Sequence, residues 1–492
     1  MGEGGGEGMP KSLRTYIADL HREVPDELVC IEREVNPANY DCTAIIKHLG
    51  AQKKFPVVIF ERALDLHGQV SPVKLMLNAE ISQSKAQIAL GVPRTMTRMD
   101  MAEECLEREK RPIKPVVVSR DEAPVKEVIQ TGADVDLYHL PCMRHHEQDG
   151  GPYVDMASVL VDRHSGIYNL SYHRMEIKSP NLTSMLVVPR HTWKIFKDHE
   201  DAGLECPVAT VLGHHPAFNM GAAYRGMFED DEYQMIGAYL QEPLRLVPSE
   251  TWGDRLLVPA DAEVVIEGAL LPGKRVVDGP FGEAPGYLGP QRYLDSLHYE
   301  VRAITRRRDA IMQTIITPEG DKPWLDLPRE GAYLRRAREA VPGVRAVCKA
   351  GRHAHFNIFI SMKKTSEGDP ARAAAAVMTF DHSKNVFVFD EDIDIFNPAD
   401  ILWALATRVQ PHADVHITPM MYKGNELDPS LLDEIYECKT SVMVVDATRP
   451  LGRPFSPVSK CPDDAMARVN LEEYIPREVL DRIPLDRTSY WA

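Results

Sequence analysis

The spacing of apolar residues changes along the chain and predicts three regions. Between 12 and 114, helix-like and strand-like patterns alternate: residues 12–22 place apolar side chains three and four positions apart, and 56–60 is a short apolar run. This alternation predicts an N-terminal α/β domain. Residues 1–11 are rich in Gly and Glu and are expected to form a disordered tail.

Between 115 and 320, short apolar runs predominate and long helical patterns are rare. Residues 157–162 and 167–177 are strand-like, and the DRHSG segment that joins them is typical of a hairpin turn. We therefore expect a β-barrel-like domain here. In 321–465, helical and strand-like segments alternate again, which predicts a second α/β domain with a largely parallel sheet. The chain is thus of mixed α/β (α+β) class, and 466–492 is expected to be a tail that packs on a neighbour or stays mobile.

Composition narrows the class of protein. A chain of 492 residues is expected to form two or three domains, and its net charge of −16 argues against binding a nucleic-acid backbone. The 8 cysteines form no Cys-x-x-Cys pair, which suits a reducing compartment and disfavours thiolate zinc sites. No apolar run is long enough to cross a membrane, and no secretory leader is recognisable. These features predict a cytoplasmic protein without membrane or nucleic-acid partners.

The most distinctive stretch is DGPFGEAPGY at 278–287. Its Pro and Gly residues exclude a helix or a regular strand, so it must be a shaped loop that holds Asp278 and Glu283 close together. A solvated surface turn is the plain alternative, since charged loops are usually exposed.

A second candidate is Arg174, in the strand-like segment 167–177 between Tyr172 and Met175. A half-buried Arg needs an acidic partner or an anionic ligand, and a structural salt bridge would satisfy it equally well. Asn169 lies an odd number of positions from Arg174, so a regular strand would point the two to opposite faces. If both serve one site, the strand must bend or bulge, and we predict an irregularity between Leu170 and His173.

Asn169 and two further residues have side chains that can coordinate a divalent metal. Asn169, His191 and Glu232 supply an amide, an imidazole and a carboxylate, a mixture that suits Mn²⁺. Three protein ligands would leave coordination positions open for a ligand phosphate. The HHEQD run at 145–149 also contains metal-binding residue types, but sequence neighbours rarely aim at one ion, so we interpret it as a loop wall.

Arg174, Asp278 and Glu283 would together suit a carboxylate substrate. The Arg would balance the anion. Two close carboxylates push their pKa values apart, so that one can hold a proton and donate it.

Several ordered motifs resemble the UbiD family of prenylated-flavin-dependent decarboxylases. They are NLSYHR at 169–174, VPRH at 188–191, DEYQMIGAYL at 231–240, DGPFGEAPGY at 278–287, DEDIDIFNPADILWALATR at 390–408 and VVDATRP at 444–450. The resemblance covers nearly the whole chain. It implies an N-terminal α/β domain at 12–114, a split β-barrel that binds prenylated FMN at 115–320, and a C-terminal α/β oligomerisation domain at 321–465 in a homodimer or homohexamer.

The resemblance also implies roles for single residues. Asn169, His191 and Glu232 would hold Mn²⁺ on the cofactor phosphate, with K⁺ nearby, and Arg174, Asp278 and Glu283 would form the catalytic set, Glu283 protonating the product carbon after CO₂ leaves. The prenylated flavin, supplied by a separate flavin prenyltransferase, would form a covalent adduct with the substrate and act as electron sink. The expected cofactor-binding residues are Asn169, Ser171, Tyr172, His173, Arg174, Arg190, His191, Met220, Gly221, Glu232 and Lys439.

Two positions depart from the family pattern. The family usually has Glu where this chain has Asp278, which is one methylene shorter but keeps the charge, and we expect it to balance Arg174. Many relatives carry a phosphate-contacting Lys where this chain has Val442, and Lys439 is the candidate for that contact.

The predicted function is reversible, non-oxidative decarboxylation of an aromatic, heteroaromatic or α,β-unsaturated carboxylic acid. The alternative is an FMN-dependent reductase, because split barrels also carry ordinary FMN, but hydride transfer to flavin does not need the Arg174 cluster. A non-catalytic oligomeric scaffold would explain the C-terminal domain but not an Asn/His/Glu set combined with two acids. Pocket-lining candidates are Met220, Trp324, Leu327, Pro328 and residues 451–455, all of which would equally suit a plain core.

Overall fold

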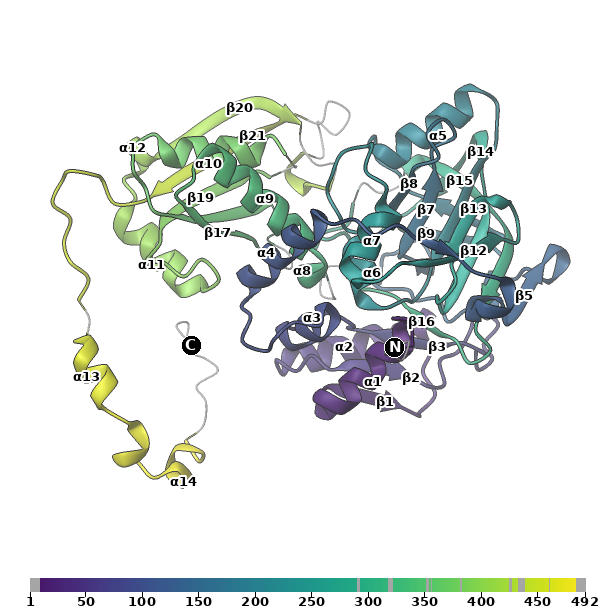
Figure 1. Cartoon of the computed structure of the whole chain (residues 1–492), viewed down its shortest axis with the longest axis horizontal. Coiled ribbons are helices and arrows are strands. Elements are labelled where there is room, and N and C mark those ends of the chain that lie inside the picture. Colours follow the sequence, from purple (N-terminus) through teal and green to yellow (C-terminus); the bar gives the residue numbers. More distant parts are fainter. Residues whose placement is uncertain are drawn as a thin grey trace, which may run out of the picture.

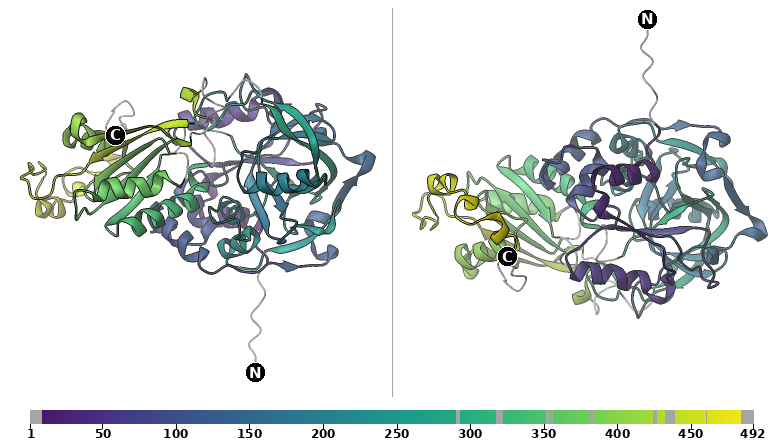
Figure 2. Two further views of the ribbon diagram at one scale, coloured as in Figure 1. Left: turned by 90° about the horizontal axis from the view of Figure 1, so that it is seen from above. Right: turned by 90° about the horizontal axis from the view of Figure 1, so that it is seen from below.

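The computed structural model describes residues 9–289, 293–316, 322–350, 354, 356–380, 383–423, 427–431, 439–459 and 461–483. Most of the tail predicted at 1–11, the link at 318–321 and the last residues of the tail predicted at 466–492 lie outside these ranges. Figure 1 shows three units: a small N-terminal layer (purple), a central curled sheet (teal) and a C-terminal unit (green). The N-terminal and central units lie against each other in every view, and the C-terminal unit lies to one side of both (Figure 2).

The N-terminal unit is a four-stranded sheet with helices around it. Its order is β1-β2-β3-β16, and β16 joins it in parallel to β3 although it follows the central sheet in the chain. The unit therefore depends on a strand more than 200 residues further along, at 311–313. The strands and helices are β1 (Leu28–Ile31), β2 (Val57–Phe60), β3 (Lys74–Leu77), β16 (Ile311–Gln313), α1 (Leu13–Glu23), α2 (Asp41–Ala51) and α3 (Gln83–Leu90). The next helix, α4 (Arg98–Glu109), packs instead against the helices Glu232–Leu240 and Leu327–Ala340 of the other two units (Figure 1).

The central unit is built on a nine-stranded sheet of order β6-β9-β10-β15-β14-β11-β7-β8, with β5 paired to β15. A three-stranded sheet, β13-β12-β4, accompanies it. The strands are β4 (Val116–Val117), β5 (Val128–Thr131), β6 (Tyr153–Val154), β7 (Ala157–Val161), β8 (Tyr168–Tyr172), β9 (Met175–Ser179), β10 (Leu182–Met185), β11 (Cys206–Val211), β12 (Arg245–Ser249), β13 (Gly253–Pro259), β14 (Val264–Asp278) and β15 (Tyr293–Arg306), and the helices are α5 (His191–Asp201), α6 (Pro216–Gly221) and α7 (Glu232–Leu240).

The chain connection between β8 and β9 forces this sheet to curl. β8 is one edge of the sheet and β9 lies next to the opposite edge, yet only His173 and Arg174 separate the two strands. Three Cα–Cα steps span at most about 11 Å, so the two ends of the sheet must come together. The result is the split barrel expected from the sequence, with the split at His173 and Arg174.

The predicted strand 167–177 is therefore two strands. Residues 168–172 pair with β7 in the predicted hairpin, and 175–179 pair with β6 and β10. The irregularity predicted between Leu170 and His173 lies slightly further along the chain: β8 is regular through Tyr172, and the break falls at His173 and Arg174, which frees the Arg174 side chain from the alternation of β8. β10 ends at Met185, and residues 186–190 connect it to α5.

The C-terminal unit contains a five-stranded sheet of order β17-β18-β19-β21-β20. The prediction of a largely parallel sheet was wrong: within the described residues, β18-β19 and β19-β21 are parallel, but β17-β18 and β20-β21 are antiparallel. Its elements are α8 (Lys322–Leu325), α9 (Leu327–Ala340), β17 (Val344–Lys349), β18 (Asn357–Met362), α10 (Asp369–Met378), β19 (Asn385–Asp390), α11 (Pro398–Arg408), α12 (Pro411–Asp414), β20 (Val415–Lys423) and β21 (Lys439–Ala447). An arm with α13 (Asp463–Arg468) and α14 (Arg477–Leu480) extends from it (Figure 1).

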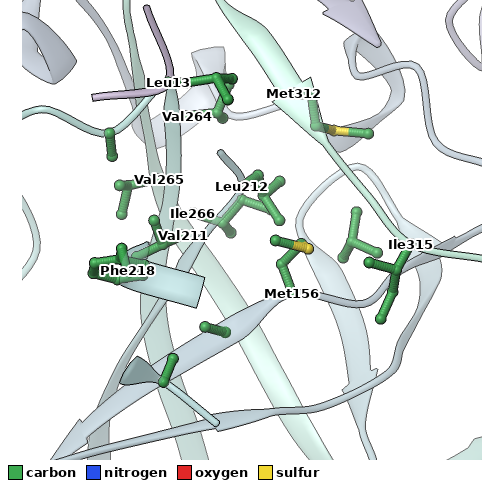
Figure 3. Close-up of a cluster of buried hydrophobic side chains, with 14 of the residues drawn as sticks. Leu13, Met156, Val211, Leu212, Phe218, Val264, Val265, Ile266, Met312 and Ile315 are labelled. Atoms are coloured by element: carbon green, nitrogen blue, oxygen red, sulfur yellow. The ribbon is translucent and has the colours of Figure 1, made fainter. Parts of the chain in front are cut away.

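One apolar core joins the first two units. Figure 3 shows Leu13 of α1 and Met312 of β16 beside Val264 and Ile266 of β14 and Met156, which precedes β7. All five side chains are at most 1% exposed. The barrel and the N-terminal layer thus fold as one packed body, whereas the C-terminal sheet has separate apolar clusters. Across the described residues, no helix has the length and apolar character needed to cross a bilayer.

Candidate active site

The loop that follows β14 carries two acids into the interior. Asp278, the last residue of β14, has no exposed surface, and Glu283 is 7% exposed. The loop folds back on itself because the N–H of Glu283 donates to the carbonyl of Tyr287 at 2.9 Å and that of Gly289 donates to Phe281 at 3.1 Å. Residues 281–285 are buried while 286–288 are exposed, so the acids face inward from a turn that reaches solvent.

The HHEQD segment lies against this loop. The Asp149 carboxylate accepts the backbone N–H groups of His145 and His146 at 2.9 and 2.7 Å, and its other oxygen accepts the N–H of Gly282 at 2.9 Å. The N–H of Gly150 donates to the Pro280 carbonyl at 2.7 Å. Asp149 therefore ties the two loops together, a positioning role that the sequence interpretation of a loop wall did not assign.

Arg174 brings the two acids together. Its Nε donates to Oδ1 of Asp278 at 2.8 Å, its Nη2 forms an ion pair with the same oxygen at 2.7 Å, and its Nη1 is paired with Glu283. The guanidinium lies 5.0 Å from the centre of the Phe281 ring. A buried cation between two buried acids, stacked on an aromatic ring, is a strongly desolvated charge cluster.

Asp278 reaches Arg174 despite its shorter side chain. Its second oxygen, Oδ2, accepts the Ser184 hydroxyl at 2.5 Å, so that both carboxylate oxygens have donors. Ser184 comes from β10, which lies beside β9, and its hydroxyl also accepts the N–H of Glu176 at 2.9 Å. The sequence offered no signal for Ser184 because a lone Ser on a strand is ordinary.

A second polar cluster lies on the other side of the break between β8 and β9. Asn169 Nδ2 donates to Glu232 Oε1 at 2.9 Å, and the N–H of Leu170 donates to Glu232 Oε2. The Thr192 hydroxyl donates to Asn169 Oδ1 at 2.8 Å. Burial raises the pKa of Glu232 well above its ordinary value, and these donors only partly oppose the shift.

Of the three expected metal ligands, Asn169 and Glu232 thus contact each other directly. His191 is the first residue of α5 and precedes Thr192, which reaches the same cluster. Its ring is half-buried beside Phe228, and burial, with Arg225 and Arg190, lowers its pKa. The donor set of amide, carboxylate and neutral imidazole fits a divalent cation, which would replace the hydrogen bond between Asn169 and Glu232.

The remaining expected cofactor residues divide into two groups. Ser171 and Tyr172 lie on β8, and His173 lies in the break with Nδ1 donating to the Leu186 carbonyl at 3.0 Å; burial lowers the pKa of His173 to about 4. Arg190 precedes α5 as its N-cap residue. These four border the two clusters described above.

Met220 and Gly221 end α6 and are completely covered by packing. A Cβ on Gly221 would lie 2.8 Å from Cγ1 of Ile236 in α7, so this glycine is required for the two helices to pack. Lys439 begins β21 and is exposed. Val442, the position at which the family resemblance leads one to expect Lys, lies within the same strand and is 1% exposed.

Comparison with known proteins agrees with this geometry. Residues 116–320 match the model of the 3-octaprenyl-4-hydroxybenzoate carboxy-lyase Rift-related domain, and 325–447 match that of the corresponding C-terminal domain. A phenolic acid decarboxylase from Sedimentibacter hydroxybenzoicus is 30% identical over 462 residues, covering 90% of this chain and 92% of that protein. An anhydromevalonate phosphate decarboxylase from Methanosarcina mazei is 30% identical over 89% of this chain and 96% of its own.

Solved structures give the same result. The UbiD-class enzyme HmfF from Pelotomaculum thermopropionicum in complex with FMN superposes with a TM-score of 0.82 at 34% identity, over 94% of this chain and 100% of that one. An evolved dimeric form of HmfF in complex with prFMN has a TM-score of 0.80 at 32% identity, with the same coverage. Two domain matches, relatives along almost the full length and the same fold together show that the chain belongs to the UbiD family of carboxy-lyases.

Proposed function

We propose that this enzyme catalyses the reversible, non-oxidative decarboxylation of an aromatic, heteroaromatic or α,β-unsaturated acid with prenylated FMN. The observation that carries the proposal is the buried cluster of Arg174 between Asp278 and Glu283. Such a cluster fits a carboxylate that enters as an anion and leaves as neutral CO₂. A flavin reductase would have no use for it.

The contacts favour different roles for the two acids. Asp278 accepts the Arg174 Nε–H on one oxygen, which also forms an ion pair with Nη2, and the Ser184 hydroxyl on the other, so Asp278 is the closer counter-charge of Arg174. One Arg charge then balances one carboxylate. A second buried carboxyl is best accommodated with a proton, which makes Glu283 the proton donor.

The reaction would then need one proton delivered at one atom. When the bond to the carboxyl carbon breaks, the electron pair left on the substrate carbon takes the proton from the Glu283 carboxyl group, and CO₂ departs. Glu283 becomes a carboxylate that pairs with Nη1 of Arg174 and regains a proton through the exposed turn at 286–288. Carboxylation is the same sequence reversed, with Glu283 as base.

The cofactor proposal rests on the solved complexes of HmfF with FMN and with prFMN. Prenylated FMN would serve as the electron sink for the departing CO₂. Asn169, His191 and Glu232 would hold Mn²⁺ at its phosphate, and K⁺ nearby is proposed from the family resemblance alone. A flavin prenyltransferase must supply the cofactor.

The test uses protein co-expressed with a flavin prenyltransferase. Mass spectrometry of the released cofactor and metal analysis of the same sample come first, followed by a panel of hydroxybenzoic, furoic, cinnamic and phosphorylated unsaturated acids assayed for CO₂ and product. The panel includes the last class because relatives are named for both phenolic acids and anhydromevalonate phosphate. We expect prenylated FMN, Mn and turnover of at least one acid. NAD(P)H oxidation without decarboxylation would instead favour the reductase.

We further propose that the enzyme assembles as a homodimer or homohexamer. The arm at 461–483 exposes Met466, Val469, Leu471 and Tyr474, each at least 47% exposed, which is unusual for apolar side chains so close together. Light scattering on the full chain should give a mass of two or six times 55.3 kDa. A mass of one chain at micromolar concentration would contradict the proposal.

A further inference from the structure

Two histidines and two aspartates converge outside the two clusters of the active site. His67 and Asp65 come from the loop between β2 and β3, whereas Asp136 is the N-cap and His139 the last residue of the 3-10 helix Leu137–His139, which precedes β6. Ligand atoms of His67, Asp136 and His139 all lie within 4.8 Å of one another. We propose that these three residues form a binding site for a divalent cation, Zn²⁺ above all, with Asp65 as the residue that orients His139.

The spacing of the ligand atoms suits a tetrahedral ion. His67 Nε2 lies 2.8 Å from Asp136 Oδ2, and His139 Nε2 lies 3.8 Å from the same oxygen. Zn–N and Zn–O bonds of about 2.0–2.2 Å at tetrahedral angles place neighbouring ligand atoms about 3.4 Å apart. Both contacts therefore come within about 0.6 Å of that value, which small side-chain rotations supply.

Asp65 holds His139 in the tautomer that a metal requires. One oxygen of Asp65 accepts the backbone N–H groups of His67 and Gln69, both at 2.9 Å, which fixes the carboxylate. The other oxygen lies 3.3 Å from His139 Nδ1. With its proton on Nδ1 and donated to Asp65, His139 presents the lone pair of Nε2 toward Asp136 and His67, as in a carboxylate–histidine–zinc arrangement.

Asp136 is oriented in the same way. Its Oδ1 accepts the N–H of Tyr138 at 2.8 Å, which leaves Oδ2 directed at His67. Each carboxylate thus uses one oxygen to cap backbone and offers the other to an imidazole. The four side chains are therefore held in a more defined arrangement than a chance contact between His and Asp on a protein surface would have.

The backbone brings the two segments together independently of any ion. The N–H of Leu66 donates to the Tyr138 carbonyl at 2.8 Å, and the Ser71 hydroxyl donates to the His139 carbonyl at 2.8 Å. Asp65 is 4% exposed, whereas the side chains of His67 and His139 are 41% and 49% exposed. The Asp65 carboxylate is thus buried, whereas the two imidazole rings are exposed to solvent. An ion can therefore enter from solvent and keep a water molecule as its fourth ligand.

The bound ion would fasten the N-terminal layer to the barrel. The 3-10 helix that carries His139 also donates the N–H of Leu137 to the Pro180 carbonyl, at the turn between β9 and β10, at 2.7 Å. The loop after β2 would thereby be joined through the metal to the strands that carry the active-site residues. This role is separate from the cofactor metal proposed above, and neither proposal requires the other.

The test is a metal titration of the full chain, with affinity tags removed and metal stripped with a chelator. Co²⁺ serves as the spectroscopic probe because its visible absorption reports tetrahedral coordination, and Zn²⁺ affinity is measured by competition. We expect one equivalent whose binding is at least 100-fold weaker in His67→Ala and in His139→Ala and unchanged in His48→Ala, which removes an exposed histidine from α2 of the same unit; any equivalent held by the cofactor cluster should be lost in Glu232→Gln instead. Glu232→Gln should leave this equivalent bound, because it alters only the cofactor cluster.

Asp65→Asn separates an oriented site from an accidental one. The Asn oxygen can still accept the two backbone N–H groups, but its amide would donate toward His139 Nδ1 and move the ring proton to Nε2. We expect Zn²⁺ affinity to fall about 10- to 100-fold while the far-ultraviolet circular dichroism is unchanged. Equal affinity in wild type, His67→Ala and His139→Ala, no bound equivalent in wild type, or loss of the equivalent only in Glu232→Gln would each overturn the proposal.

Discussion

The cluster of Arg174, Asp278 and Glu283 predicts a marked non-additivity between two mutations. In Asp278→Asn, Glu283 can give up its proton and become the anionic partner of Arg174 on Nη1, and in Glu283→Gln, Arg174 still has Asp278 on Nε and Nη2. Each single change therefore leaves the buried Arg paired, and we expect a loss of about 1 kcal/mol of unfolding free energy. The double variant leaves a cation of 6% side-chain exposure without a counter-charge.

Removing every partner of a buried charge costs about 3–5 kcal/mol. The double variant should therefore lose about 2 kcal/mol more than the two single variants together. For a cooperative unit of the size of the barrel, 1 kcal/mol corresponds to about 2–4 °C. The expected fall in Tm is about 3 °C for each single variant and about 10 °C or more for the double variant.

The assay is thermal unfolding by circular dichroism, with urea unfolding to convert the shifts into free energies. Glu205→Gln is a matched control, because it removes one acid from Arg302 in a pair whose side chains are 40% and 31% exposed and should cost under about 1 kcal/mol. The reasoning would be refuted if Asp278→Asn alone were as destabilised as the double variant, or if the two effects simply added.

Three further predictions concern activity, pH and packing. In Glu283→Gln, cofactor content should be unchanged while the decarboxylation rate, followed by product chromatography, falls about 10²–10⁴-fold because the proton donor is lost; a rate within tenfold of wild type would exclude Glu283 as that donor. Burial, and to a lesser degree Arg307, lowers the pKa of His214 to about 3, so the unfolded chain takes up a proton below pH 6.5 that the folded chain refuses. The free energy of unfolding should then fall by about 1.4 kcal/mol per pH unit as pH drops from 6.5 toward 3. In urea titrations, His214→Asn should remove about 2–3 kcal/mol of the loss between pH 6.5 and 4.5. Identical pH slopes in the wild type and the variant would contradict this. Gly221→Ala places a Cβ 2.8 Å from Ile236 and should cost about 1–3 kcal/mol, whereas Gly50→Ala in α2, where the nearest atom is 3.8 Å away, should be neutral or stabilising in the same unfolding assay.

Local pattern was sufficient where its signal was strong. α1 follows from the three-and-four spacing of apolar residues in 12–22, and the hairpin of β7 and β8 follows from its turn sequence. These signals act over a few residues, so they do not depend on distant parts of the chain. The motifs around Asn169, Arg174, Asp278 and Glu283 likewise identified the family and most of the candidate active site, because each consists of neighbouring residues.

Pairings between distant segments were decided only by the tertiary structure. The sequence does not show that β16 completes the N-terminal sheet, and its alternation of helix and strand predicted a largely parallel C-terminal sheet, in which β17 and β20 in fact pair in antiparallel fashion. The sequence did indicate that Asn169 and Arg174 could not share one regular strand. Where the chain breaks, however, depends on the closing of the barrel, because only the curl of the whole sheet brings β8 next to β9.

The supporting residues of the site had no sequence signal for the same reason. Ser184 and Thr192 are common residue types in unremarkable positions, and the HHEQD run drew attention to Asp149 without indicating its partner; each gains its role from a partner at least 20 residues away. The His67, Asp136 and His139 cluster is likewise spread over 73 residues, with no metal-binding spacing along the chain. The sequence by itself determined which chemical groups the protein possesses and which local elements carry them. Long-range packing decided which of those groups meet, because hydrogen bonds and ion pairs form only between atoms that the folded core brings within about 3 Å.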